Sequence, residues 1–67
     1  MEILINNGSV KLREETDLLA LVRTREEYVE NQCIVVLNGK VVPKEKYAHI
    51  LLRNGDEVLV VPGLLGG

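Results

Sequence analysis

The sequence predicts a single α+β domain in which one main helix lies across one face of a mixed β-sheet. Three observations support this prediction. Short stretches of alternating apolar and polar residues indicate strands, one stretch carries apolar residues at helical spacing, and three Asn-Gly pairs mark tight turns. The 67 residues, 1–67, form one domain, with no internal repeat and no linker long enough to separate two domains.

The first part of the chain is expected to form a hairpin and the main helix. Residues 1–5 alternate, Asn7-Gly8 signals a type I′ turn, and residues 10–13 alternate again as an antiparallel return strand. Thr16 is the expected N-cap of the helix, and Asp17 places a negative charge in its first turn. Five apolar residues fall within an arc of about 120° and define the face that covers the sheet: Leu18, Leu21, Val22, Tyr28 and Val29.

The second half is expected to add three strands and a short helical turn. Residues 33–37 are nearly all apolar, as in a central strand covered on both faces. Pro43 suits the first position of a helical turn through Tyr47, where its missing N–H is not needed. The other segments are a turn at Asn38-Gly39, a strand at 40–42, apolar residues that pack back at 50–52, a turn at Asn54-Gly55 and a strand at 57–61. This order is that of the β-grasp, or ubiquitin-like, architecture, which places the first and last strands side by side in the middle of the sheet.

Composition and charge exclude several classes of function. A formal net charge of −2 provides no basic surface for nucleic acid. The single cysteine, Cys33, rules out an internal disulfide and suits a reducing compartment. No apolar run approaches the roughly 20 residues of a membrane span, and no signal-peptide pattern follows Met1. We therefore expect a cytoplasmic protein that contacts no membrane and is a monomer on its own.

The sequence shows no self-contained active site. Cys33 lies in an apolar strand with no basic neighbour, which predicts a buried structural thiol rather than a nucleophile. His49 stands alone, and no Cys/His spacing indicates zinc. Asp56 and Glu57 follow a turn signal, and we interpret them as turn residues rather than an acid–base pair. The chain is therefore expected to have no catalytic residue, no metal site, no bound cofactor and no enzyme activity.

The C-terminal segment is the candidate functional feature. Regular strand should end at Pro62-Gly63, because proline lacks the ladder donor and glycine weakens a strand. Residues 62–67 are therefore expected to form a flexible tail, an unusual place for Leu64 and Leu65. One interpretation is a frayed end that packs loosely on the core. The other is a tail whose Gly63, Leu64 and Leu65 bind the surface of a partner protein.

The last two residues, Gly66 and Gly67, favour a function for this tail. Without a Cβ they can pass a constriction that would exclude any side chain. The terminal carboxylate is a poor electrophile until it acquires a leaving group, such as the adenylate formed from ATP. An α-carboxylate on an extended Gly-Gly arm suits that chemistry, with the catalytic residues supplied by the partner.

Four motifs follow one another in the second half of the chain: residues 36–43 (Val-Leu-Asn-Gly-Lys-Val-Val-Pro), Tyr47-Ala48, residues 52–58 (Leu-Arg-Asn-Gly-Asp-Glu-Val) and Gly66-Gly67. In the order of these motifs the chain resembles the ThiS family, the sulfur carrier proteins of thiamine biosynthesis. The resemblance covers essentially the whole chain and is clearest from residue 34 onward.

The resemblance implies a reaction cycle carried by Gly67. An E1-like adenylating enzyme uses ATP and magnesium to convert the Gly67 carboxylate to an acyl-adenylate. A sulfur donor, supplied by a cysteine desulfurase, replaces AMP and leaves a thiocarboxylate. Thiazole synthase then accepts the sulfur while it builds the thiazole ring of thiamine. The carrier itself catalyses nothing.

Alternative functions stay open on the sequence alone. The step Pro62-Gly63-Leu64-Leu65 is less typical of the thiamine branch, and a proline there is also similar to the small subunit of molybdopterin synthase. The alternatives are a related carrier for molybdopterin, cysteine or another pathway, a ubiquitin-like protein modifier, and a β-grasp interaction module with an incidental Gly-Gly end.

Overall fold

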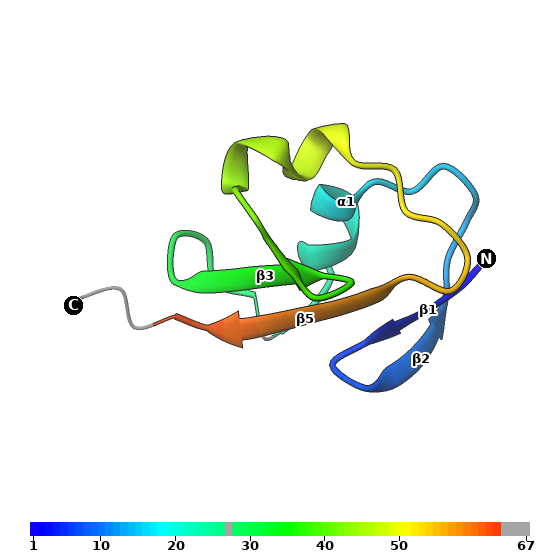
Figure 1. Ribbon diagram of the computed structural model, residues 1–67, viewed down its shortest axis with the longest axis horizontal. Coiled ribbons are helices and arrows are strands. Elements are labelled where there is room, and N and C mark those ends of the chain that lie inside the picture. Colours follow the sequence, from blue (N-terminus) through cyan, green and yellow to red (C-terminus); the bar gives the residue numbers. More distant parts are fainter. Residues whose placement is uncertain (27, 64–67) are drawn as a thin grey trace.

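The structure is a computed structural model and describes residues 1–26 and 28–63. It has a five-stranded sheet in the order β2-β1-β5-β3-β4, and both helices lie on the same face of that sheet (Figure 1). This is the expected β-grasp arrangement. In chain order the elements are β1 (Glu2–Ile5), β2 (Gly8–Lys11), α1 (Leu18–Val22), β3 (Cys33–Leu37), β4 (Lys40–Val42), the 3₁₀-helix η1 (Lys44–His49) and β5 (Glu57–Pro62).

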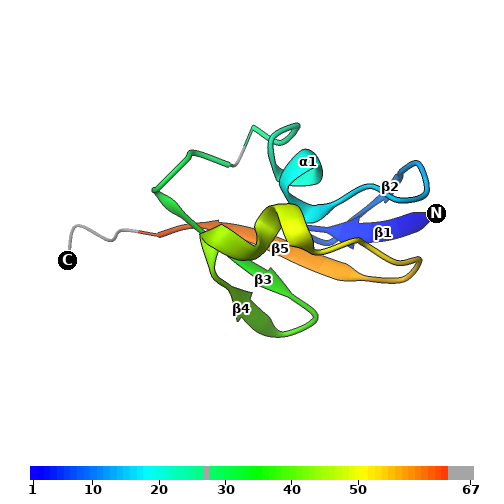
Figure 2. The same cartoon turned by 90° about the horizontal axis from the view of Figure 1, so that it is seen from above.

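The last strand, β5, occupies the centre of the sheet. It pairs with β1 in parallel, with Ile5 opposite Val58, and with β3 in antiparallel orientation from Leu37–Val58 to Cys33–Pro62. The expected adjacency of the first and last strands is therefore confirmed. Seen from above, the hairpin of β1 and β2 and the hairpin of β3 and β4 flank β5 on opposite sides (Figure 2).

The core lies between the sheet and the two helices. Alternate strand residues point into it because successive side chains of a strand face opposite ways. Each large side chain buried there contributes roughly 1.5–3 kcal/mol of hydrophobic stabilisation. The buried apolar residues are Ile3, Ile5, Leu18, Leu21, Val22, Val35, Val42, Tyr47, Leu52, Val58 and Val60.

The main helix begins one residue later than predicted. Its N-cap is Asp17, whose carboxylate accepts a hydrogen bond from the Ala20 N–H at 2.7 Å. The Thr16 hydroxyl instead donates to the Arg13 carbonyl at 2.8 Å, so it caps the preceding turn. Both residue types are good caps, and the tertiary contacts decide between them, because Asp17 also forms a bridge with Leu51.

The same helix also ends earlier than its apolar pattern suggested. After Val22 the backbone hydrogen bonds span three residues instead of four, as in a 3₁₀ turn. The Thr24 hydroxyl also donates to the Leu21 carbonyl at 2.6 Å, and this bond competes with the backbone hydrogen bonds of a helix. Tyr28 and Val29 were expected on the buried face of the helix and lie beyond its end. Tyr28 is half-buried, whereas Val29 is 49% exposed.

The first hairpin turn is shifted by one residue from its predicted position. The two loop residues are Asn6 and Asn7, with φ of +48° and +69°, and Gly8 is already paired with Ile5. A type I′ turn requires positive φ at both central positions, and asparagine tolerates this conformation better than most residues. The Asn7-Gly8 signal therefore identified the hairpin but not its register.

The other two predicted turns are confirmed and are joined to each other. The Asn38 amide accepts a hydrogen bond from the Glu57 N–H at 2.9 Å and donates to Asp56 at 3.0 Å. Asp56 also accepts from the Arg53 N–H at 2.8 Å, which closes the turn at Gly55, where φ is +91°. The polar residues of these motifs thus hold the start of β5, with Asp56 as a turn residue, as expected, and Glu57 as the first residue of the strand.

The connection between η1 and β5 differs in two details from the prediction. The 3₁₀-helix extends to His49, and Pro43 lies at its N-cap rather than in its first turn. Leu51 was expected to pack inward together with Ile50 and Leu52, but it is 60% exposed. The backbone is extended here, so Ile50 and Leu52 point to the core while the residue between them points away.

Candidate functional site

β5 carries the chain from the middle of the sheet to the candidate tail. Pro62 still pairs with Cys33, and the Gly63 N–H donates to the Gln32 carbonyl at 2.9 Å. Both residues were expected in the tail beyond the sheet, and this expectation is wrong for the described part. The strand can include Pro62 because the backbone N–H groups of successive residues point to opposite sides of a strand. The N–H that Pro62 lacks would point away from β3, so no hydrogen bond to β3 is lost.

The remaining candidate residues lie outside the described residues. These are Leu64 and Leu65, expected to bind a partner, and the terminal Gly66 and Gly67, expected to carry the chemistry. Their roles stay predictions. What the structure defines is the base of the tail, from Val60 to Gly63, and the groups that hold it.

On one side, the base of the tail is held by the Asn6 side chain. Its Oδ1 accepts a hydrogen bond from the Val60 N–H at 2.8 Å, and its Nδ2 donates to the Val60 carbonyl at 3.2 Å. The backbone N–H of Asn6 also donates to the Val58 carbonyl at 2.9 Å. Since β1 turns away after Ile5, the amide of Asn6 takes the place of the next strand residue and extends the pairing of β5. Sequence reasoning missed this role, because the Asn-Asn-Gly pattern indicates only a turn.

On the other side, the base of the tail is held by the segment before β3. A hollow of about 240 Å³ lies here, and Tyr28, Cys33, Lys44 and Tyr47 are among its lining residues. The rings of Tyr28 and Tyr47 meet edge to face, with their centroids 6.4 Å apart. Burial raises the pKa of the Tyr47 phenol above its usual value, and the neighbouring Tyr28 adds to this effect.

Cys33 is half-buried rather than fully buried as expected. Its Sγ accepts a hydrogen bond from the Val29 N–H at 2.9 Å, which gives the thiol a structural contact. Lys44 lines the same hollow, but its ammonium is engaged by Glu30 at 3.0 Å and Asn31 at 2.6 Å. The geometry supports the interpretation of Cys33 as a packing residue.

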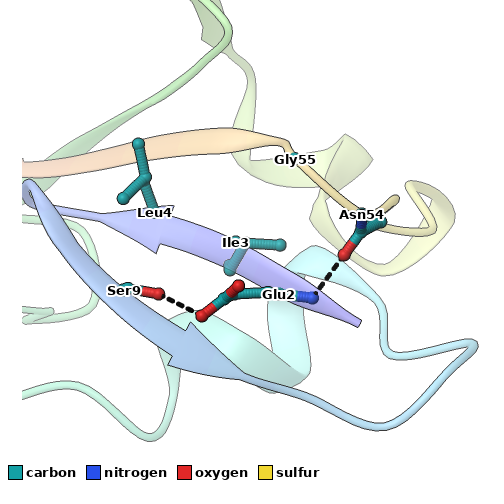
Figure 3. Close-up of a pocket in the computed structure, with 6 residues that line it drawn as sticks. All are labelled: Glu2, Ile3, Leu4, Ser9, Asn54 and Gly55. Atoms are coloured by element: carbon teal, nitrogen blue, oxygen red, sulfur yellow. Dashed lines mark hydrogen bonds between the residues drawn. The ribbon is translucent and has the colours of Figure 1, made fainter.

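A second hollow, of about 220 Å³, lies at the opposite end of β5 (Figure 3). The Ser9 hydroxyl donates to the Glu2 carboxylate at 2.6 Å, and the Glu2 N–H donates to Asn54 Oδ1 at 2.6 Å. These polar groups satisfy one another and join the first hairpin to the turn at Gly55. We therefore interpret the polar residues of this hollow as structural contacts, remote from the base of the tail.

The face of the sheet opposite the helices is largely apolar. Its residues alternate with those that enter the core, and cross-strand pairs place Ile34 beside Val61 and Val36 beside both Leu59 and Val41. Three of the side chains are well exposed: Leu4 at 41%, Val41 at 68% and Val61 at 38%. We call this surface the outer patch and define it as Leu4, Ile34, Val36, Val41, Leu59 and Val61. It follows β5 toward Gly63.

Fold and site together define the class of this protein: a β-grasp domain of the ubiquitin-like type, whose central strand leads directly into the C-terminal segment. The comparison with family models then gives the family. Residues 3–67 match the model described as "ThiS family", and the chain belongs to this family. The match extends through the terminal Gly-Gly. It supports a role as a sulfur carrier.

A solved structure shows the same fold over the whole chain. It is the crystal structure of the thiamine biosynthesis protein (ThiS) from Geobacter metallireducens, with a TM-score of 0.85, 22% sequence identity and complete coverage of both chains. At this identity the likeness shows the fold alone. No curated protein matches the chain. Within residues 1–26 and 28–63, no helix has the length and apolar character to cross a membrane, and no three metal-ligating side chains form a group.

Proposed function

We propose that this chain carries sulfur on its C-terminal carboxylate in the formation of the thiamine thiazole. The observation that supports this most strongly is the family match, which includes Gly66 and Gly67 at the end of a β-grasp domain. In this proposal an E1-like enzyme adenylates Gly67 with ATP and magnesium. A sulfur donor fed by a cysteine desulfurase converts the acyl-adenylate to a thiocarboxylate, and thiazole synthase accepts the sulfur.

The chemistry requires no catalytic side chain from the carrier. A Gly67 carboxylate oxygen attacks the α-phosphorus of ATP, and pyrophosphate leaves. The terminal sulfur of the donor persulfide then forms a C–S bond to the acyl carbon, and the C–O bond to AMP breaks. A thiol such as cysteine cleaves the S–S bond of the resulting acyl disulfide, which releases the thiocarboxylate and leaves the donor joined to that thiol as a disulfide. The carrier's part is to present one carboxylate at the end of a chain narrow enough to enter the partner's active site, which the two glycines allow.

The outer patch supports a second part of the proposal, the docking of the partner enzymes. Exposed apolar patches on small domains commonly mark surfaces that bind other proteins. Val41→Asp should weaken binding of the adenylating enzyme about tenfold, because an apolar contact would then bury a charge. Stability should change little, since Val41 is 68% exposed. Leu51→Asp is the matched control, because Leu51 is 60% exposed but lies away from the patch. Equal binding by both variants would contradict docking through the outer patch.

The test of the proposed function is a reconstituted charging reaction. The chain is incubated with the adenylating enzyme, ATP, magnesium, a cysteine desulfurase and cysteine, and its intact mass is measured. We expect one oxygen to be exchanged for sulfur, with fragment masses placing the sulfur at Gly67. Sulfur found on Cys33 as a persulfide would contradict the carboxylate mechanism, and an isopeptide bond to lysines of other proteins would favour a protein modifier.

A further inference from the structure

The segment between α1 and β3 ends in a tight turn at residues 29–32. The Gln32 N–H donates to the Val29 carbonyl at 2.9 Å, and the Val29 N–H donates to Cys33 Sγ at 2.9 Å. Asn31 has a φ of +67°, a conformation that asparagine adopts more readily than most residues. The turn is thus closed at both ends by hydrogen bonds of its own.

Lys44, the first residue of η1, holds this turn from outside. Its Nζ lies 3.0 Å from the Glu30 carboxylate and 2.6 Å from Asn31 Oδ1, so it binds the two central residues of the turn together. The hydrogen bond and the charge of Lys44 lower the pKa of Glu30 below its usual value. This contact ties the turn to the helix side of the molecule.

The turn also contacts the base of the tail. Its last residue, Gln32, accepts the hydrogen bond from the Gly63 N–H at 2.9 Å. Gly63 is the last residue that the structure describes, and four residues, 64–67, follow it in the sequence. Among the described residues, this bond is the final link between β5 and the segment leading into β3.

We propose that the Lys44-locked turn at 29–32 is an anchor that fixes the backbone at Gly63 and thereby the direction in which the tail leaves the sheet. Lys44 is then a positioning residue, which acts through the Gln32 carbonyl. Four residues span up to about 14 Å when extended, so a change of direction at Gly63 moves the terminal carboxylate by a large distance. An anchored base reduces the volume that the carboxylate must search before it enters the partner.

The anchor is tested first on the isolated chain, by amide hydrogen exchange at Gly63. Lys44→Met should accelerate exchange of this amide about two- to fivefold, the range expected for one exposed ion pair. Lys46→Met is the matched control: Lys46 lies exposed on the same short helix, and we find no ion pair between it and any other described residue. Lys44→Arg, which keeps the cation, should restore the slow exchange. Equal exchange at Gly63 in the wild type and Lys44→Met would overturn the anchor.

The consequence for the reaction rests on the proposed function and has its own readout. In the charging reaction, Lys44→Met should raise the half-saturating carrier concentration by about the same two- to fivefold factor and leave the maximal rate unchanged. Lys46→Met should match the wild type in both. Identical kinetics for Lys44→Met, despite faster exchange at Gly63, would refute the positioning role. Failure of the wild-type chain to be charged at all would contradict the proposed function. The exchange rate at Gly63 would still show whether Lys44 anchors this residue.

Discussion

Removal of the half-buried Asn6 side chain should destabilise the domain, because this side chain is bonded to the central strand. Asn6→Ala loses two hydrogen bonds to the Val60 backbone, at 2.8 and 3.2 Å, each worth about 0.5–1.5 kcal/mol. Alanine at a φ of +48° adds about 1 kcal/mol of backbone strain. The expected loss is about 2–4 kcal/mol, which is a large part of the roughly 3–10 kcal/mol available to a domain of this length.

Urea denaturation followed by circular dichroism measures this loss as a shift of the unfolding midpoint at constant slope. Asn7→Ala is the matched control, because Asn7 has a φ of +69° but an exposed side chain with no hydrogen bond to a described residue. It should lose only the backbone preference, about 1 kcal/mol. If both variants lose the same free energy of unfolding, the Asn6 amide does not hold β5 and our account of the base of the tail is wrong.

Three further predictions concern the thiol, the terminus and the anchor. Cys33→Ala should lower the free energy of unfolding by about 1 kcal/mol and leave thiocarboxylate formation intact, and loss of charging in a folded variant would refute the packing role. Deletion of Gly66-Gly67 should abolish charging and shift the thermal midpoint by only a few degrees, under about 1 kcal/mol; charging of this variant at the wild-type rate would end the carrier hypothesis. The pKa of the Glu30 carboxyl, followed by NMR, should lie below its usual value in the wild type and rise toward that value in Lys44→Met. Because the pKa is lowered in the folded chain, the ionised carboxylate stabilises the fold at pH values above the normal carboxyl range, and this stabilisation is lost as the pH falls.

The positions of the strands along the chain followed from local sequence, whereas the adjacency of the first and last strands was expected from the β-grasp architecture. Alternation placed Ile3 and Ile5 in the core. The apolar run at 33–37 gave β3 its observed bounds, but the expected cover on both faces is wrong, because Ile34 and Val36 lie half-buried in the outer patch. The alternating strands were predictable because burial on one face of a strand imposes a period of two residues, which is visible without knowledge of the partner strand.

The details that failed depend on contacts between distant parts of the chain. The turn register at Asn6 is tied to Val60, 54 positions away, and the choice of Asp17 as the N-cap goes with its bridge to Leu51. β5 continues through Pro62 because Pro62 pairs with Cys33 and the next N–H, that of Gly63, donates to the Gln32 carbonyl. On this side of the strand Pro62 needs no N–H donor. No local pattern contains this information.

A candidate site could be proposed from the sequence because the chemistry that we propose for it lies at Gly67. Gly66 and Gly67 are recognisable from their residue type and position alone. The groups that hold the base of the tail are not, since Lys44 and Asn31 are ordinary surface residues until the fold brings them together at 2.6 Å.

The most direct test of the carrier account follows a labelled sulfur atom from the chain into the product. The chain is charged with heavy-isotope sulfur, purified away from the donor and mixed with thiazole synthase and its other substrates, with no further sulfur source. The account predicts that the label lies at Gly67 before the reaction and in the thiazole afterwards, while the chain returns to its carboxylate form. Label that stays on the chain while unlabelled thiazole forms, or label that was carried on Cys33, would contradict it.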